Sequence, residues 1–127
     1  MNSECNASIS YDGDYAESWN QRKAIGRLAT KCWECNDPIP AGTAHTRISM
    51  LTEGERRTYR ICAACQTIAD EFCDDGQMVG ALWESMSDSV FDEGAPLQAC
   101  LNRVIGVAAK TKIRDAWIDH KRSRGEL

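Results

Sequence analysis

The sequence predicts an α+β fold, in which a two-stranded β-hairpin packs with two or three helices, and three observations lead to it. Two Cys-x-x-Cys pairs stand 26 residues apart in a chain of 127 residues. The segment between them alternates apolar and polar side chains, as strands with one buried face do. The region after the second pair carries apolar residues three and four apart, the spacing of amphipathic helices. The length suits one compact domain.

Residues 1–16 are predicted to form a flexible N-terminal lead, because they are rich in Asn, Ser, Asp and Gly and show no periodicity. Cys5 within it is expected to be a free thiol. The next segment, 19–30, fits a short helix or a strand equally well, since its apolar residues are too few to separate the two patterns.

The four paired cysteines are predicted to share one metal ion: Cys32, Cys35, Cys62 and Cys65. Two residues between cysteines allow a tight turn to aim both sulfurs at one point, and four thiolates suit a tetrahedral Zn²⁺. Asn36, after the second cysteine, tolerates the left-handed backbone that such a turn needs. We expect one structural zinc ion, with a redox pair or buried free thiols as the alternatives. Cys73 is expected at a core or boundary position, and Cys100 in the core.

The hairpin between the cysteine pairs is predicted to turn at 52–55, which places Arg47 opposite Arg60 and Ile48 opposite Tyr59. Two arginines that face each other lower the stability of the hairpin unless an anion pairs with them. That anion is either the acidic segment of this chain or an external phosphate.

Three helices are predicted after the hairpin. The first begins at the second cysteine pair, the second covers 77–90, and the third covers 97–122 with Pro96 in its first turn and Gly106 as a weak point. The stripe of the third helix either packs on the core or joins two chains in a homodimer; it comprises Leu97, Leu101, Ile105, Ala109, Ile113, Trp117 and His120.

The order of cysteine turn, hairpin and helix resembles a treble-clef zinc finger, over about a third of the chain. The resemblance is carried by Cys32, Cys35, Ile39, Gly42, Cys62 and Cys65. It implies a finger fold around one zinc ion but no single function, because treble clefs serve in ribosomal, DNA-binding, ubiquitin-related and adaptor proteins. The wider layout, with Pro-x-Pro after the first pair and an acidic, Trp-containing helix, resembles small zinc-binding proteins of phages and prophages. We divide the chain into the lead 1–16, a zinc-binding region 17–75 and a helical region 76–127, packed as one domain.

The net charge of −4 hides a segregation of charge along the chain. Residues 61–102 hold eight acids and no Lys or Arg, whereas residues 103–124 hold seven bases against two acids. Such asymmetry indicates internal pairing or a charged partner.

These features favour a small cytoplasmic binding protein that acts by protein–protein contact. The sharpest form of this hypothesis is a phage-encoded inhibitor of a host nuclease or defence complex. A four-cysteine site is closed, and the sequence holds no phosphate loop, dinucleotide fingerprint or nucleophile elbow, so we do not expect an enzyme. The expected contact surface either mimics phosphates or is simply solvated; it comprises Asp70, Glu71, Asp74, Asp75, Glu84 and Asp88.

The alternative is a regulator that binds nucleic acid. Its contact residues would be Arg47, Arg56, Arg60, Lys110, Lys112, Arg114, Lys121 and Arg122. A sequence pI of about 5.1 weighs against general nucleic-acid binding. No secretory leader and no apolar run of about 20 residues is found, so we expect no membrane contact and a location in the cytoplasm, that of a bacterial host if the chain is phage-encoded.

Overall fold

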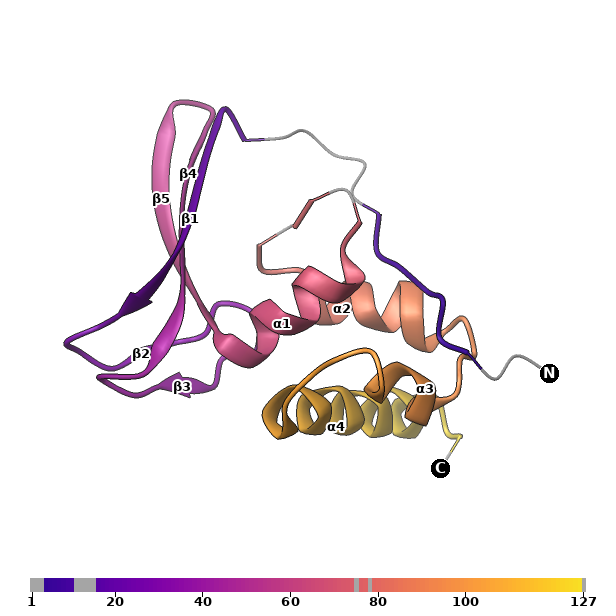
Figure 1. The fold of residues 1–127 in the computed structure, drawn as a ribbon. Helices are drawn as coiled ribbons and strands as arrows, with labels where there is room; N and C mark the ends of the chain where they lie inside the picture. The colour runs from indigo at the N-terminus through magenta and orange to yellow at the C-terminus, as the bar shows by residue number, and fades with distance from the viewer. Residues whose placement is uncertain (1–3, 11–15, 75, 78, 127) are drawn as a thin grey trace.

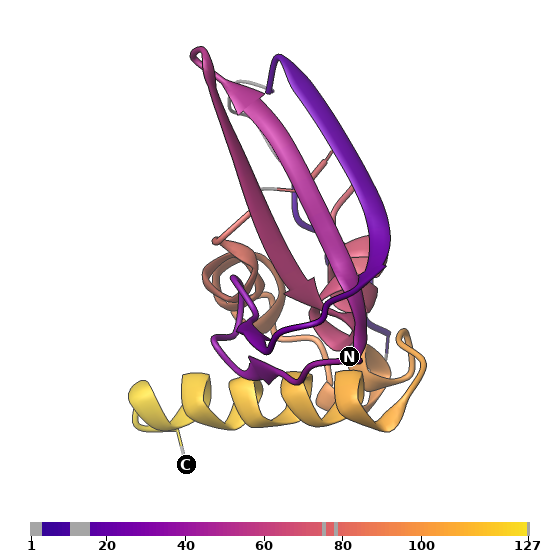
Figure 2. The same ribbon diagram turned by 90° about the vertical axis from the view of Figure 1, so that its left-hand side faces the viewer.

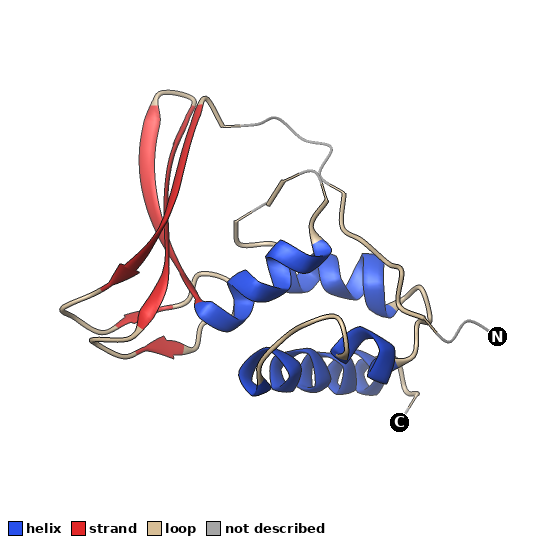
Figure 3. Ribbon diagram, in the orientation of Figure 1, coloured by secondary structure: helices blue, strands red, loops and turns tan. Residues whose placement is uncertain are grey.

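The computed structural model describes residues 4–10, 16–74, 76–77 and 79–126 and shows a mixed α+β chain. A three-stranded sheet stands on one side of the molecule and the helices gather on the other (Figure 1). A short two-stranded sheet lies at the lower end of the larger sheet in this view, and colouring by secondary structure makes the separation of strands and helices plain (Figure 3). The predicted fold class is confirmed at this level.

The larger sheet is antiparallel, with the strand order β1-β4-β5. Its strands are β1 (Ser18–Ile25), β4 (Ala44–Thr52) and β5 (Glu55–Cys62). The predicted hairpin register is confirmed, because Arg47 lies opposite Arg60 and Thr52 pairs with Glu55. The two loop residues, Glu53 and Gly54, have φ values of 51° and 79°, as a two-residue turn that follows the strand twist requires. The ambiguous segment after the lead is a strand, β1.

The smaller sheet brackets the first cysteine pair. β2 (Thr30–Lys31) pairs with β3 (Pro38–Ile39), and the chain between them turns through Asn36, whose φ of 66° is the left-handed conformation predicted for it. Helix α1 (Ala63–Phe72) then begins directly after β5, with Cys62 as its N-cap. Turn, hairpin and helix therefore follow one another in the predicted order.

The second predicted helix is shorter than expected. Helix α2 (Leu82–Met86) continues into a π-helical turn, η1 (Ser87–Phe91), and the residues described between 76 and 81 are not helical. Gly80 explains the late start, because its φ of +93° is not helical. A Cβ atom there would also lie 3.1 Å from the Trp33 side chain.

The prediction of one long helix over 97–122 is wrong. The structure has α3 (Leu97–Leu101) and α4 (Val107–Ser123), separated by a turn that ends at Gly106 with φ +98°. Ile105 is consequently 89% exposed instead of lying in the apolar stripe. Ile113 and Ala109 of α4 are buried in the core of the same chain, so this part of the stripe is already covered without a second copy.

The predicted flexible lead, 1–16, differs from the structure over residues 4–10; residues 1–3 and 11–15 lie outside the described part. Ile9 is buried and joins the end of α1, since its N–H donates to the Phe72 carbonyl (2.7 Å) and its carbonyl accepts from the Asp74 N–H (3.0 Å). Cys5 forms a disulfide with Cys100 of α3, so the prediction of a free thiol is wrong. This pairing joins residues 95 positions apart, which no local pattern reveals.

Arg103 fastens the same N-terminal segment to the helices. Its guanidinium lies 4.0 Å from the centre of the Phe72 ring, its Nε donates to Glu71, and its Nη1 donates to the carbonyls of Cys5 and Ala7. The core beneath is one cluster shared by the sheet base, α1, α2, η1, α3 and α4. Among the described helices, none has the length and hydropathy needed to cross a bilayer.

Candidate metal centre and arginine face

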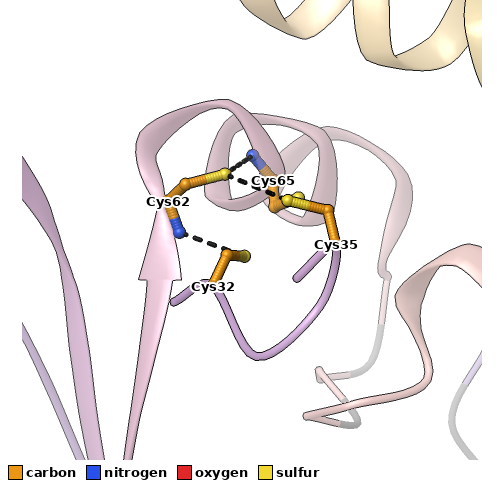
Figure 4. Close-up of side chains that lie close together, drawn as sticks. All are labelled: Cys32, Cys35, Cys62 and Cys65. Atoms are coloured by element: carbon orange, nitrogen blue, oxygen red, sulfur yellow. Dashed lines mark hydrogen bonds between the residues drawn. The ribbon is translucent and has the colours of Figure 1, made fainter. Parts of the chain in front are cut away.

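The four paired cysteines converge on one point (Figure 4). Cys32 and Cys35 come from the turn between β2 and β3, Cys62 ends β5, and Cys65 lies in the first turn of α1. Their sulfur atoms all lie within 4.8 Å of one another, and the Sγ atoms of Cys35 and Cys62 are 3.9 Å apart. In a tetrahedral four-thiolate site with bonds of about 2.3 Å, neighbouring sulfurs stand about 3.8 Å apart. The cluster therefore fits a metal ion.

Backbone N–H groups already point at these sulfurs. Cys32 Sγ accepts from the N–H groups of Glu34 (3.4 Å) and Cys62 (3.3 Å), and Cys62 Sγ accepts from that of Cys65 (3.4 Å). Such bonds favour the thiolate over the thiol, because they place positive partial charge beside the sulfur. The two turns thus hold the sulfurs in place and prepare them for ionisation.

The pKa values of Cys32, Cys62 and Cys65 show how these three thiols interact. Hydrogen bonds from the Cys62 and Cys65 side chains lower the pKa of Cys32. The bond to Cys32 raises the pKa of Cys62 to about 11, and the pKa of Cys65 is raised by its bonds to Cys32 and Cys62 and by burial. One thiol ionises readily and its neighbours then keep their protons, since adjacent thiolates repel. A bound dication removes that repulsion and allows all four to ionise.

Lys112 connects the cysteine cluster to α4. Its Nζ donates to Cys35 Sγ (3.3 Å) and also bonds the Asp37 carboxylate. Burial works to lower the pKa of Lys112, but Asp37 and Cys35 together raise it above its ordinary value, so the amine stays charged. A cation therefore lies beside a site that four thiolates and one dication would leave at −2. The sequence places Lys112 among nucleic-acid contacts, and the structure gives it this internal role instead.

Glu34 is a second connection that sequence reasoning missed. Its Oε1 accepts from the N–H groups of Gly80 (2.9 Å) and Leu82 (3.1 Å), and burial raises the pKa of its carboxyl group. The N-cap residue of α2, Ala81, has no side chain that could accept a hydrogen bond from the first turn. Glu34, from the cysteine turn, accepts the bond from the Leu82 N–H instead and so caps the helix. The spacing in the sequence gives no hint of it, because the partners are 46 and 48 residues away.

One face of the large sheet is rich in arginine, and we call it the arginine face. Arg22 of β1, Arg47 of β4 and Arg60 of β5 lie in one row across all three strands. Residues directly opposite in antiparallel strands share a face, so the whole set follows from the register. The arginine face comprises Ser18, Leu51 and Arg56; Asn20, Ser49 and Thr58; Arg22, Arg47 and Arg60; and Ala24, His45 and Cys62.

This face points away from the helices. The opposite face carries Ile48 and Ile61, both 0% exposed within the core cluster, so it is the one that meets the body of the molecule. Figure 2 shows the sheet in front of the helices, with no helix laid over its near side. Ser49 and His45 are also buried on the arginine face, where Arg56 bonds the Ser49 hydroxyl and Arg60 bonds the His45 ring.

In the part of the chain that the structure describes, no Asp or Glu pairs with Arg22, Arg47 or Arg60. Arg60 Nη1 lies 2.8 Å from His45 Nε2, and Arg56 Nη1 donates to Ser49 Oγ (3.4 Å). Because His45 Nδ1 lies 3.0 Å from the Thr43 carbonyl, it carries the proton and Nε2 accepts from Arg60. All these partners are neutral, and the register gives the face no Asp or Glu. Arg22 was missed because β1 itself was ambiguous.

The basic residues near the C-terminus are held differently, since each has an internal partner. Lys110 donates to the Leu101 carbonyl (2.8 Å), and Lys112 is engaged as described above. The remaining pairs are Arg114–Asp115, Lys121–Glu126, Arg122–Asp119 and Arg124 with Asp92 and Glu126. The structure therefore separates the predicted nucleic-acid residues into an open group on the sheet and a paired group on α4.

The predicted acidic surface is divided in the same way. Glu71 is paired with Arg103, and Asp70 accepts from Gln66. Three further side chains are exposed and have no partner among the described residues: Asp74, Glu84 and Asp88. Asp75 lies outside the described residues.

No known protein family matches this chain, and searches among curated proteins and solved structures find no similar protein.

Proposed function

We propose that this chain is a zinc-stabilised binding protein without catalytic activity, and that it holds the phosphate backbone of nucleic acid on its arginine face. The observation that carries the proposal is the row of Arg22, Arg47 and Arg60 across three strands. Like charges directly opposite one another are destabilising, so such a row is costly unless an anion joins it. Guanidinium groups bind phosphate through paired N–H donors, which suits them to this ligand.

Zinc is the metal that we assign to the cysteine cluster. Four thiolates at tetrahedral spacing, with two residues inside each pair, are the donor set of structural zinc sites. The order of cysteine turn, hairpin and α1 supports membership of the treble-clef group. The residues that would hold the ion are Cys32, Cys35, Cys62 and Cys65.

Lys112→Met is expected to weaken zinc binding about tenfold, because outer partners of metal ligands commonly contribute 10- to 100-fold in affinity. The substitution removes the ammonium that lies beside Cys35 and leaves an apolar stem of similar length. Competition against a chelator of known zinc affinity measures the change. Lys121→Met is the matched control, since Lys121 on the same helix pairs with Glu126 and contacts no cysteine. Equal affinities of the two variants would contradict the role of Lys112.

The absence of catalysis is supported by the chemistry of the site. A catalytic zinc keeps one position open for water or substrate, and four cysteines fill every position. His45 lies opposite Cys62, but both of its ring nitrogens are engaged, by Thr43 and by Arg60. His120 is bonded to Asp92. Neither histidine has a free ring nitrogen to act as a general base at the cysteine cluster.

Substituting the arginine row tests the nucleic-acid proposal. Arg47→Ala is expected to weaken binding to a labelled 20-base-pair duplex about tenfold, as the loss of a charged hydrogen-bonded contact of about 1.5 kcal/mol implies. The slope of the logarithm of affinity against the logarithm of salt concentration should become less negative by about 0.9, the value for one phosphate contact. Fluorescence anisotropy over a range of salt concentrations measures both. The fold should be retained, because removing Arg47 also removes the repulsion by its neighbours.

Arg114→Ala and Arg122→Ala are the matched controls, since they make the same charge change at exposed positions of α4 that are paired internally. They should bind the duplex as the unaltered protein does. If all three variants weaken binding equally, net charge rather than the arginine face governs it, and the proposal fails.

A second candidate function is contact with a basic protein partner, for example as an inhibitor. It is favoured by Glu84 and Asp88, which lie one helical turn apart on α2 and η1 and are both exposed. A pull-down from bacterial lysate with and without nuclease distinguishes the two. A stoichiometric protein that survives nuclease and is lost with Glu84→Gln/Asp88→Asn supports this candidate; recovery of nucleic acid alone supports the first.

A further inference from the structure

We infer that the arginine face takes double-stranded rather than single-stranded nucleic acid. The inference rests on the proposed function and specifies its ligand. Three features lead to it: the lack of an exposed aromatic ring, the groups suited to phosphate, and the acids that bound the positive area.

The face exposes no aromatic ring, because the one ring it carries, that of His45, is buried and bonded to Thr43 and Arg60. In the register of the sheet, Trp19 lies opposite Met50 and Tyr59 lies opposite Ile48, so both rings belong to the opposite face. Tyr59 is also engaged there by Trp33, with ring centres 5.0 Å apart. Proteins that bind single strands gain about 1–3 kcal/mol per base from stacking on aromatic side chains. This surface cannot supply that energy.

What the face presents instead is suited to phosphates. Four guanidinium groups are joined by the hydroxyl of Thr58 and the amide of Asn20, both exposed and both groups that bind phosphate oxygens. Strands stand about 4.8 Å apart, so the row spans about 10 Å on a rigid support. A duplex carries its phosphates at fixed spacing and loses little freedom on such a surface. A flexible single strand must be ordered there without the stacking that would offset the loss.

The positive area has a limit at the tip of the sheet. Glu53 and Glu55 lie at the β4–β5 turn, and Glu17 precedes β1 with its N–H bonded to the Leu51 carbonyl. Arg57, the base nearest to this turn on the opposite face, is already paired with Glu55. The acids end the favourable region, which leaves contacts to about three or four phosphates. The logarithm of duplex affinity should then fall with the logarithm of salt with a slope of about −3.

The test compares ligands on the zinc-loaded chain of 127 residues. A labelled 16-base-pair duplex and a labelled 16-nucleotide strand of a sequence that cannot pair are titrated at low salt and across a salt series. We expect the duplex to bind at least about tenfold more tightly, with the slope given above. Equal or tighter binding of the single strand would overturn this inference while leaving the proposed function intact. Binding to neither ligand at low salt would overturn both.

A gain-of-function variant tests the reason for the preference. Thr58→Trp places an aromatic ring on the arginine face at an exposed position of the edge strand β5. It is expected to raise single-strand affinity at least about fivefold and to leave duplex affinity nearly unchanged, because one stacked base contributes about 1–3 kcal/mol. Thr52→Trp is the control on the opposite face, also exposed. If Thr58→Trp gains no more than this control, the ligand does not lie on the arginine face.

Discussion

Removal of the zinc ion proposed for the cysteine cluster, by a strong chelator, is expected to unfold the region between β2 and α1 and to loosen the helices packed on it. Cys32 and Cys65 are completely buried within the core cluster, so the cysteine cluster forms part of the core. Structural zinc contributes about 10–16 kcal/mol of apparent binding energy in small fingers. A domain of ordinary stability has about 5–15 kcal/mol in total. Loss of the ion therefore removes most of the stability of the chain.

Circular dichroism during chelation, read together with zinc content, measures this effect. We expect one zinc per chain, and loss of structure in step with loss of metal. Cys65→Ser should show the same defect without a chelator, whereas Cys73→Ser, at a cysteine outside the cluster, should retain the metal. A metal-free protein that keeps its full signal would show that the cluster does not depend on an ion.

Loss of the Cys5–Cys100 disulfide is expected to lower the free energy of unfolding by about 2–5 kcal/mol under oxidising conditions. The bond closes a loop between residues 95 positions apart, and long loops lose the most chain entropy when they are closed. Chemical denaturation of Cys5→Ser/Cys100→Ser against the unaltered protein measures the difference. Both residues are buried, so serine also places hydroxyls in an apolar setting.

A reducing agent separates these two contributions. With the disulfide reduced, the stability of the unaltered protein should fall most of the way to that of the double variant. Arg103, the Ile9 hydrogen bonds and core packing would still hold residues 4–10. If reduction leaves the midpoint of unfolding unchanged, the disulfide makes no contribution and the prediction is wrong. The reductant should not be a thiol, so that it does not compete for the metal proposed for the cysteine cluster.

The parts of the fold that were predicted correctly depend on local chemistry. The spacing of the cysteine pairs fixes two tight turns, and the left-handed Asn36 is a property of that turn. The turn at Glu53 and Gly54 together with the alternation of β4 and β5 fixes the register, so the opposition of Arg47 and Arg60 could be stated in advance.

The parts that were missed depend on contacts between distant segments. β1 shows no alternation of apolar and polar residues because it is an edge strand exposed over most of its length, and Arg22 was therefore not joined to the arginine row. The N-terminal segment looks flexible in composition, but a disulfide, Arg103 and a bridge from Ile9 to Cys73 hold residues 4–10. The break at Gly106 interrupts a periodicity that continues on both sides of it, so the pattern alone predicted one helix.

The charge pattern was similarly incomplete as a guide to binding. The sequence grouped the sheet arginines with the bases of the C-terminal helix, whereas the structure shows internal partners for the latter and only neutral ones for the former. Pairing in space, rather than the sum of charges along the chain, decides which surface remains available to an anion.

The location of the bound ligand is the most direct test of this account. Amide chemical shifts of the zinc-loaded protein, recorded as a short duplex is added at low salt, report each residue that meets it. We predict that the changes concentrate on β1, β4 and β5, at the positions of the arginine face. Changes confined to α2 and η1 or to α4, or the absence of any change, would contradict the assignment of this face as the binding surface.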